Sequence, residues 1–182
     1  VESFFLILPF SISAVVWPLK PQNEGHPISH YYGDYEYDEL HPEIDILASA
    51  GTEVYACITG VVRRVIITDN DNPDNVYANV VEICTSFPDT DHYWGYGHIY
   101  AIPDLRSAIN YPSEQVTIIP TTDFYLGKIC NWPYDPSGGV ESHLAFYYRN
   151  IEKTEGYRLE IPSNPFFEGL PLPSMYPVID KI

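Results

Sequence analysis

The stretch Val61-Val62-Arg63-Arg64-Val65-Ile66-Ile67-Thr68 is dominated by β-branched residues, and Thr59-Gly60 separates it from the strand-like run Glu53–Ile58. Such runs, bounded by turn residues, are typical of strands. A similar run, Asn79–Thr85, follows the polar loop Asp69–Asn75. The two runs predict a long β-hairpin in which residues 79–85 pair with residues 61–67.

The rest of the chain indicates the same fold class. Further strands are predicted at Ile44–Leu47, Tyr93–Ala101, Phe124–Ile129 and His143–Tyr148. The helix candidate, Asp104–Ser113, can hold one or two turns before Pro112 ends it. We therefore expect an all-β fold.

The chain is strongly acidic. Its 182 residues include 25 Asp and Glu against 9 Lys and Arg, which gives a formal net charge of −16. Such a charge repels phosphate backbones and anionic membrane surfaces, so we expect no nucleic-acid partner. The apolar run near the N-terminus, Phe4–Phe10, is far shorter than the ~20 residues of a membrane span, so no membrane span is expected.

The three cysteines, Cys57, Cys84 and Cys130, stand among apolar neighbours, and none forms a C-x-x-C pair. They are expected to be small buried core residues. One disulfide plus a free thiol is the alternative, and the sequence does not name the pair. A cysteine-based zinc site is not supported.

A metal-ligand pattern occurs in His41-Pro42-Glu43-Ile44-Asp45. In an extended strand, residues four apart lie about 13 Å apart, so His41 and Asp45 share one ion only if the chain turns between them. Pro42 makes such a turn plausible. Imidazole and carboxylate together suit Zn²⁺, although this spacing alone is a weak pattern.

Further motifs follow in a fixed order. They are Gly51-Thr52-Glu53-Val54-Tyr55-Ala56 with Thr59-Gly60-Val61-Val62, then Tyr96-Gly97-His98, Leu126-Gly127-Lys128-Ile129 and Ser142-His143-Leu144-Ala145-Phe146. The ordered series resembles the lysostaphin-type (LytM-like) zinc metallopeptidases, which cut peptide cross-links in bacterial cell walls. The resemblance covers about residues 17–149. It implies antiparallel β-sheets forming an open groove, a core of the duplicated hybrid motif type, with extended terminal segments.

Carried over residue by residue, the resemblance makes His41 and Asp45 zinc ligands. It makes His98 and His143 the pair that transfers protons and stabilises the transition state. The family's third protein ligand is the second histidine of an H-x-H motif, and here that residue is Ala145. A methyl group cannot bind a metal, so zinc is expected to be weakly bound or absent.

Alternatives stay open around this site. His26 or His30 could replace the missing ligand, although solvent exposure is their default, and Tyr147 is a poorer candidate. Glu43 stands where the family usually has glycine, which indicates a changed groove floor. The family's oxyanion-stabilising tyrosine has four candidates, of which Tyr35 is the first choice: Tyr31, Tyr32, Tyr35 and Tyr37.

We expect three segments: an N-terminal arm or signal remnant at 1–16, a peptidase-like domain at 17–150, and a Pro-rich tail at 151–182 that packs on the domain. The apolar start followed by small residues resembles the end of a secretory signal, although no basic segment precedes it. Together with the acidic composition, this favours an exported, extracellular or periplasmic protein.

Two function classes follow. The first is a peptidoglycan zinc metalloendopeptidase-type domain that is impaired or inactive because of Ala145. The second is a non-catalytic relative that binds cell-wall peptides, regulates another cell-wall hydrolase or builds an extracellular structure. A third interpretation takes Ala145 as an engineered change in an intact enzyme. The sequence predicts that Ala145→His restores much of the zinc binding and activity.

Overall fold

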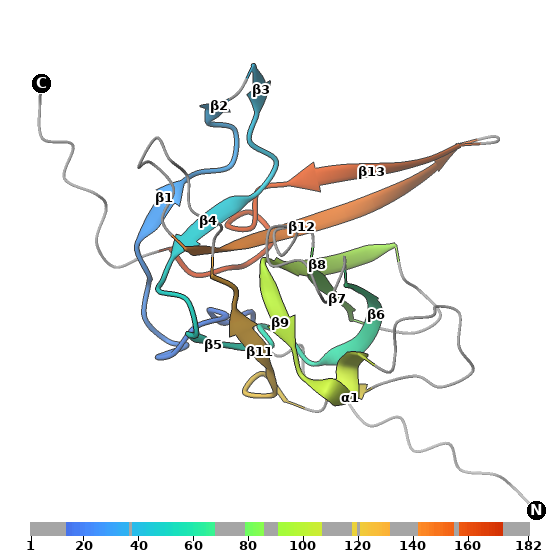
Figure 1. The fold of residues 1–182 in the computed structure, drawn as a ribbon. Helices are drawn as coiled ribbons and strands as arrows, with labels where there is room; N and C mark the ends of the chain where they lie inside the picture. The colour runs from blue at the N-terminus through green and yellow to red at the C-terminus, as the bar shows by residue number, and fades with distance from the viewer. Residues whose placement is uncertain are drawn as a thin grey trace, which may run out of the picture.

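The computed structural model describes residues 14–36, 38–67, 79–85, 91–106, 118–119, 121–131, 142–154 and 157–172. These ranges consist mainly of strands, with one short helix (Figure 1). The loop 69–75, residues 107–113 of the helix candidate, and both chain ends lie outside them. The elements are β1 (Ile28–His30), β2 (Tyr35–Glu36), β3 (Glu39–Leu40), β4 (Ile44–Leu47), β5 (Glu53–Tyr55), β6 (Gly60–Ile66), β7 (Val80–Cys84), β8 (His92–Gly97), β9 (Ile99–Ala101), α1 (Pro103–Arg106), β10 (Ile118–Ile119), β11 (Tyr125–Ile129), β12 (His143–Thr154) and β13 (Tyr157–Ser163).

The described strands form one large and two small sheets. The large sheet has the order β1-β4-β12-β8-β7-β6-β10, with β13 also paired to β12. A second sheet has the order β5-β11-β9, and β2 pairs with β3. The pairings of these sheets are antiparallel. The expected all-β, antiparallel fold class is confirmed.

The two faces of the large sheet have different roles. Because side chains alternate along a strand, Leu144 and Phe146 of β12 lie on one face and His143 and Ala145 on the other. Leu144 and Phe146 belong to the main hydrophobic core, together with Trp94 and Tyr96 of β8 and residues of β5, β9 and β11. Burial of the apolar side chains on the face of Leu144 and Phe146 drives the packing. The opposite face is left to carry polar side chains.

Several predicted elements are confirmed. The predicted hairpin is present, since β7 pairs antiparallel to β6 with Val62 opposite Ile83. Ile44–Leu47 is β4 with the predicted bounds. The predicted strand Tyr93–Ala101 is instead two strands, β8 and β9, interrupted at His98. All three cysteines are buried, as expected, and are free thiols.

The C-terminal part departs from the expected extended tail. Strand β12 continues to Thr154, and its part from Tyr148 to Thr154 pairs with β13, so residue 150 falls inside a strand. Pro162 is accommodated because β13 has β12 as its described partner and can lie at the edge of the sheet. Leu170 then packs into the main core. The proposed segment boundaries remain predictions.

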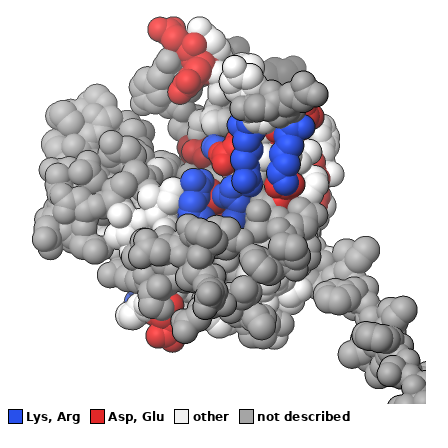
Figure 2. All heavy atoms as spheres, turned by 90° about the vertical axis from the view of Figure 1, so that its right-hand side faces the viewer, with Lys and Arg blue, Asp and Glu red and all other residues white. Residues whose placement is uncertain are grey.

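A buried carboxylate anchors the hairpin. Glu82 is fully buried, and it forms ion pairs with Arg63 and Arg64 of β6 and accepts a hydrogen bond from Tyr147 of β12. Figure 2 shows several Lys and Arg side chains gathered on the face turned to the viewer, interspersed with acidic ones. In the part of the chain described here, no helix is long and apolar enough to cross a membrane.

Candidate active site

Asp45 is the centre of the candidate site. It lies in β4, is 5% exposed, and pairs across the sheet with Ala145 of β12 on one side and with His30 of β1 on the other. A buried carboxylate needs a cation or hydrogen bonds to offset its lost hydration. The side chains around Asp45 therefore decide what chemistry the site can perform.

His41 reaches Asp45 because the chain turns between them, as the sequence analysis required. The His41 Nε2 atom lies 3.4 Å from Asp45 Oδ2. The His41 Nδ1 atom donates a hydrogen bond of 2.8 Å to the carbonyl oxygen of Glu43, because a carbonyl can only accept. In the neutral ring this bond leaves the Nε2 lone pair facing the carboxylate, an arrangement that calls for a cation or a proton between them.

His143 approaches the same carboxylate from β12. Its Nε2 atom lies 3.7 Å from Asp45 Oδ1, and its ring is packed edge-on against that of His98, with 4.8 Å between the centroids. The structure thus brings together all four residues that the sequence analysis singled out. Their assignment as two metal ligands and two catalytic histidines remains a prediction.

The backbone at His98 is unusual. Its φ angle of 61° lies in the left-handed region, which costs a non-glycine residue about 1–2 kcal/mol. Two hydrogen bonds hold it there: the amide of His98 donates to Asn79, and its carbonyl accepts from Cys130. Strained residues of this kind cluster at functional sites. The kink ends β8 and positions His98 beside His143.

The donor set fits a metal ion. Asp45 Oδ1 is buried and, among the described residues, accepts no hydrogen bond. An unpaired carboxylate oxygen in such a position is costly. An imidazole nitrogen and carboxylate oxygens are ligands that Zn²⁺ accepts. Three residues offer ligand atoms that all lie within 4.8 Å of one another: His41, Glu43 and Asp45.

Glu43 is more than a changed groove floor. Its side chain is half-buried, and burial, followed by the charge of Asp45, raises the pKa of its carboxyl group. The neighbouring His41 and the more distant Arg149 counteract this rise. Glu43 was not predicted as a candidate ligand, although its position two residues before Asp45 was a usable signal, because residues two apart in a strand share a face.

His30 also lies closer to the site than expected, because the sequence predicted it to be solvent-exposed. Its Nδ1 atom lies 3.2 Å from Asp45 Oδ2, and its ring centroid is 5.8 Å from that of His41. The short strand Ile28–His30 lies between turn-forming residues, so the sequence gave no clear strand pattern there.

The other candidate ligands lie elsewhere. The Nε2 atom of His26 is 3.1 Å from the carbonyl oxygen of Leu19, and its ring packs on Trp17. The Tyr147 hydroxyl donates to Glu82 within a buried cluster, so it is already committed. Tyr35 is exposed. Tyr37 lies outside the described residues, and the oxyanion tyrosine remains a prediction.

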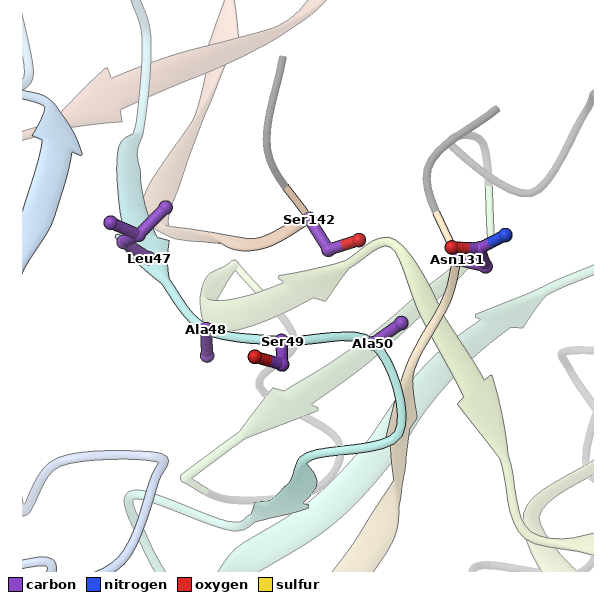
Figure 3. A pocket seen from close by; sticks show the side chains of 6 residues that line it. All are labelled: Leu47, Ala48, Ser49, Ala50, Asn131 and Ser142. Atoms are coloured by element: carbon purple, nitrogen blue, oxygen red, sulfur yellow. The ribbon is translucent and has the colours of Figure 1, made fainter. Parts of the chain in front are cut away.

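A pocket of about 670 Å³ is lined by residues from the segments that carry the site. Its six lining residues are mostly small and uncharged (Figure 3): Leu47, Ala48, Ser49, Ala50, Asn131 and Ser142. Leu47 is two residues from Asp45, Ser142 precedes His143, and Asn131 follows Cys130, whose amide binds the His98 carbonyl. The pocket is therefore connected to all the site-bearing segments.

Comparison with known proteins agrees with this architecture. No protein-family model matches the chain, and no curated protein matches it. Solved structures do match. The solution structure of lysostaphin aligns with a TM-score of 0.52 at 15% identity, covering 80% of this chain and 52% of that one.

Two further structures are similar. The catalytic domain of lysostaphin from Staphylococcus simulans has a TM-score of 0.52 at 15% identity and covers 79% of this chain and 91% of that one. A zinc-containing peptidase from Vibrio cholerae has a TM-score of 0.52 at 14% identity and covers 88% of this chain and 41% of that one. The chain spans about half the length of lysostaphin.

These matches define the class of fold. The chain has the lysostaphin-type (LytM-like) fold, as the ordered motifs predicted. Within that class, it matches most of the length of the lysostaphin catalytic domain.

Proposed function

We propose that this chain is a peptidoglycan metalloendopeptidase-type domain. The observation that carries the proposal is the convergence on Asp45: His41 and His143 lie 3.4 and 3.7 Å from its carboxylate oxygens, and His98 packs on His143. One buried carboxylate, three imidazoles and a pocket lined by the same segments are the components that metal-assisted peptide hydrolysis requires.

The residues have separate roles in this proposal. His41 and Asp45 hold the metal. Bound zinc would supply Lewis-acid polarisation of the scissile carbonyl group and a lowered pKa of the attacking water. His98 and His143 accept the proton released by that water and return it to the leaving amine. The strained backbone of His98 keeps its ring in place for this transfer.

The pocket supports a peptide substrate with small side chains. Its lining is neutral, and small residues such as Ala48, Ser49 and Ala50 leave the backbone accessible to an extended peptide. The cell-wall peptides of bacteria fit this description. The fold matches include the antimicrobial peptidase lysostaphin, which supports the same substrate class. An exported location, extracellular or periplasmic, is part of this proposal.

Ala145 supports a second candidate function. If His41 and Asp45 alone hold the metal, zinc is bound weakly and activity is impaired, because catalytic zinc sites normally have three protein ligands. The chain would then act as a non-catalytic relative that binds peptidoglycan peptides or partners another cell-wall hydrolase, using the same pocket.

Hydrolysis of purified peptidoglycan and of a pentaglycine peptide tests the proposal. We expect cleavage with added Zn²⁺, none with a chelator, and at least a hundredfold loss in His98→Ala and His143→Ala. Tyr157→Ala, at an exposed position of β13, is the control and should keep full activity. Binding to peptidoglycan without cleavage under any metal condition would reject the peptidase function and favour the second candidate.

A further inference from the structure

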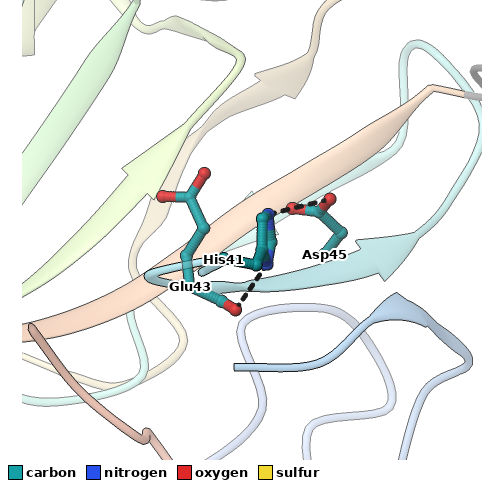
Figure 4. Close-up of side chains that lie close together, drawn as sticks. All are labelled: His41, Glu43 and Asp45. Carbon is teal, nitrogen blue, oxygen red and sulfur yellow. Dashed lines mark hydrogen bonds and ion pairs between the residues drawn. The ribbon is translucent and has the colours of Figure 1, made fainter. Parts of the chain in front are cut away.

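The carboxylate of Glu43 lies close to His41 and Asp45. Glu43 directly precedes β4, at a bend in the chain. Figure 4 shows the side chains of Glu43 and Asp45 flanking the ring of His41. One ligand atom from each of the three residues lies within 4.8 Å of the other two.

Two features of this cluster favour a bound cation. The Asp45 side chain is more than nine-tenths buried, and its Oδ1 atom accepts no hydrogen bond from the described part of the chain. The Glu43 carboxylate lies close to it, and two such groups repel each other unless a cation or a proton intervenes. The Nε2 atom of His41 also faces this space, 3.4 Å from Asp45 Oδ2, while Nδ1 is used in the hydrogen bond to the Glu43 carbonyl oxygen.

We propose that Glu43 is the third protein ligand of the metal, with His41 Nε2 and Asp45, in the position that Ala145 leaves without a donor. Ala145 faces Asp45 directly across the β4–β12 ladder and offers only a methyl group. Glu43 supplies the missing donor from the segment that precedes β4. The inference rests on the proposed metal-dependent function and names the ligand set of that site.

This ligand set changes the metal preference. One imidazole and two carboxylates are harder donors than two imidazoles and one carboxylate. Carboxylate-rich sites accept Mn²⁺ more readily, whereas imidazole-rich sites favour Zn²⁺. The chain therefore binds Zn²⁺ with a smaller margin over Mn²⁺ than a variant with the imidazole-rich set, Glu43→Gly combined with Ala145→His.

His30 has a different role. Its Nδ1 atom lies 3.2 Å from Asp45 Oδ2, and its side chain is 43% exposed. A hydrogen bond from this ring fixes the orientation of the Asp45 carboxylate, which makes His30 a positioning residue. Its removal should weaken metal binding less than removal of a ligand.

Equilibrium dialysis and calorimetry of the full chain with Zn²⁺ and with Mn²⁺ test the inference without relying on activity. Glu43→Gln, which keeps the side-chain shape, should raise the Zn²⁺ dissociation constant at least tenfold. Glu39→Gln makes the same carboxylate-to-carboxamide change at an exposed position of β3. It is the matched control and should leave the Zn²⁺ dissociation constant unchanged. Thermal unfolding without metal checks that both variants are folded. The visible absorption of bound Co²⁺ should weaken in Glu43→Gln only.

The outcomes separate this inference from the proposed function. If Zn²⁺ binding depends on His41 but not on Glu43, the assignment of Glu43 is wrong while the metal site stands. A tenfold loss in His30→Asn with none in Glu43→Gln would give the ligand position to His30 and overturn the assignment. If the unmodified chain binds neither metal, the metal-dependent function fails as well.

Discussion

Ala145 of β12 and Asp45 of β4 are direct partners across an antiparallel ladder. Side chains of directly opposed residues that share a face lie about 4.5–5.5 Å apart at Cβ. The residue at position 145 therefore faces the one buried carboxylate of the candidate site. A single change at this position alters the metal site with no change of the fold.

Ala145→His should lower the Zn²⁺ dissociation constant at least tenfold, because it adds an imidazole that faces Asp45. Combined with Glu43→Gly, it leaves three protein ligands and one position for water, and this double variant should cut pentaglycine faster than the unmodified chain. The measurements are zinc content after dialysis and peptide hydrolysis. Tyr157→His, at an exposed position of β13, is the control. Unchanged zinc retention in Ala145→His would refute the predicted geometry.

His98→Gly should be more stable than His98→Ala by about 1 kcal/mol, because glycine adopts a positive φ without steric cost and alanine does not. Both variants should lose peptidase activity together. Urea unfolding measures the difference. At Tyr100, a strand residue of β9, the order should reverse, with the alanine variant more stable. Equal stabilities at position 98 would contradict the strained backbone.

Glu82→Gln should lower the free energy of unfolding by roughly 3 kcal/mol, because it leaves the Arg63 and Arg64 charges without their buried partner. Glu160→Gln is the comparison. Glu160 is more exposed and pairs with Arg149 and with Arg63, which keeps its pairing to Glu82, so its loss should cost less than about 1 kcal/mol. Denaturant titration of both variants measures the loss in the free energy of unfolding. Similar losses would mean that the burial of Glu82 contributes little to stability.

Alkaline pH should destabilise the protein partly through Cys57. Burial raises the pKa of its thiol well above the ordinary value, despite an opposing hydrogen bond from Tyr96. The unfolded thiol ionises near pH ~8.5, whereas the folded one stays protonated. The contribution to stability is therefore present below that pH and is lost as the pH rises above it.

Unfolding in urea between pH 7 and 9.5 tests whether stability falls as the pH rises. Cys57→Ala should lose less stability over this range than the unmodified protein does. A thiol reagent at pH 8 should leave Cys57 unmodified in the folded protein and label it after denaturation. If the stability of both proteins depended equally on pH, burial would not be keeping the Cys57 thiol protonated in the folded state.

Much of the fold was predictable from local patterns. The β-branched runs identified the β6–β7 hairpin, and the strand β4 was predicted with its observed bounds. Short strands such as β1 and β10 were not, because two or three residues carry too little periodicity to be distinguished from loop. The break between β8 and β9 at His98 escaped prediction because a left-handed non-glycine residue has no composition signal.

The sequence by itself determined the fold class, the four candidate residues His41, Asp45, His98 and His143, and the missing donor at Ala145. These follow from local composition and from the order of motifs. Only the tertiary structure decided what surrounds Asp45. Strand register placed His30 and Ala145 on either side of it, and a bend at Glu43 brought His41 and Glu43 close to it. Register depends on long-range pairing between strands, and no local stretch of sequence encodes it.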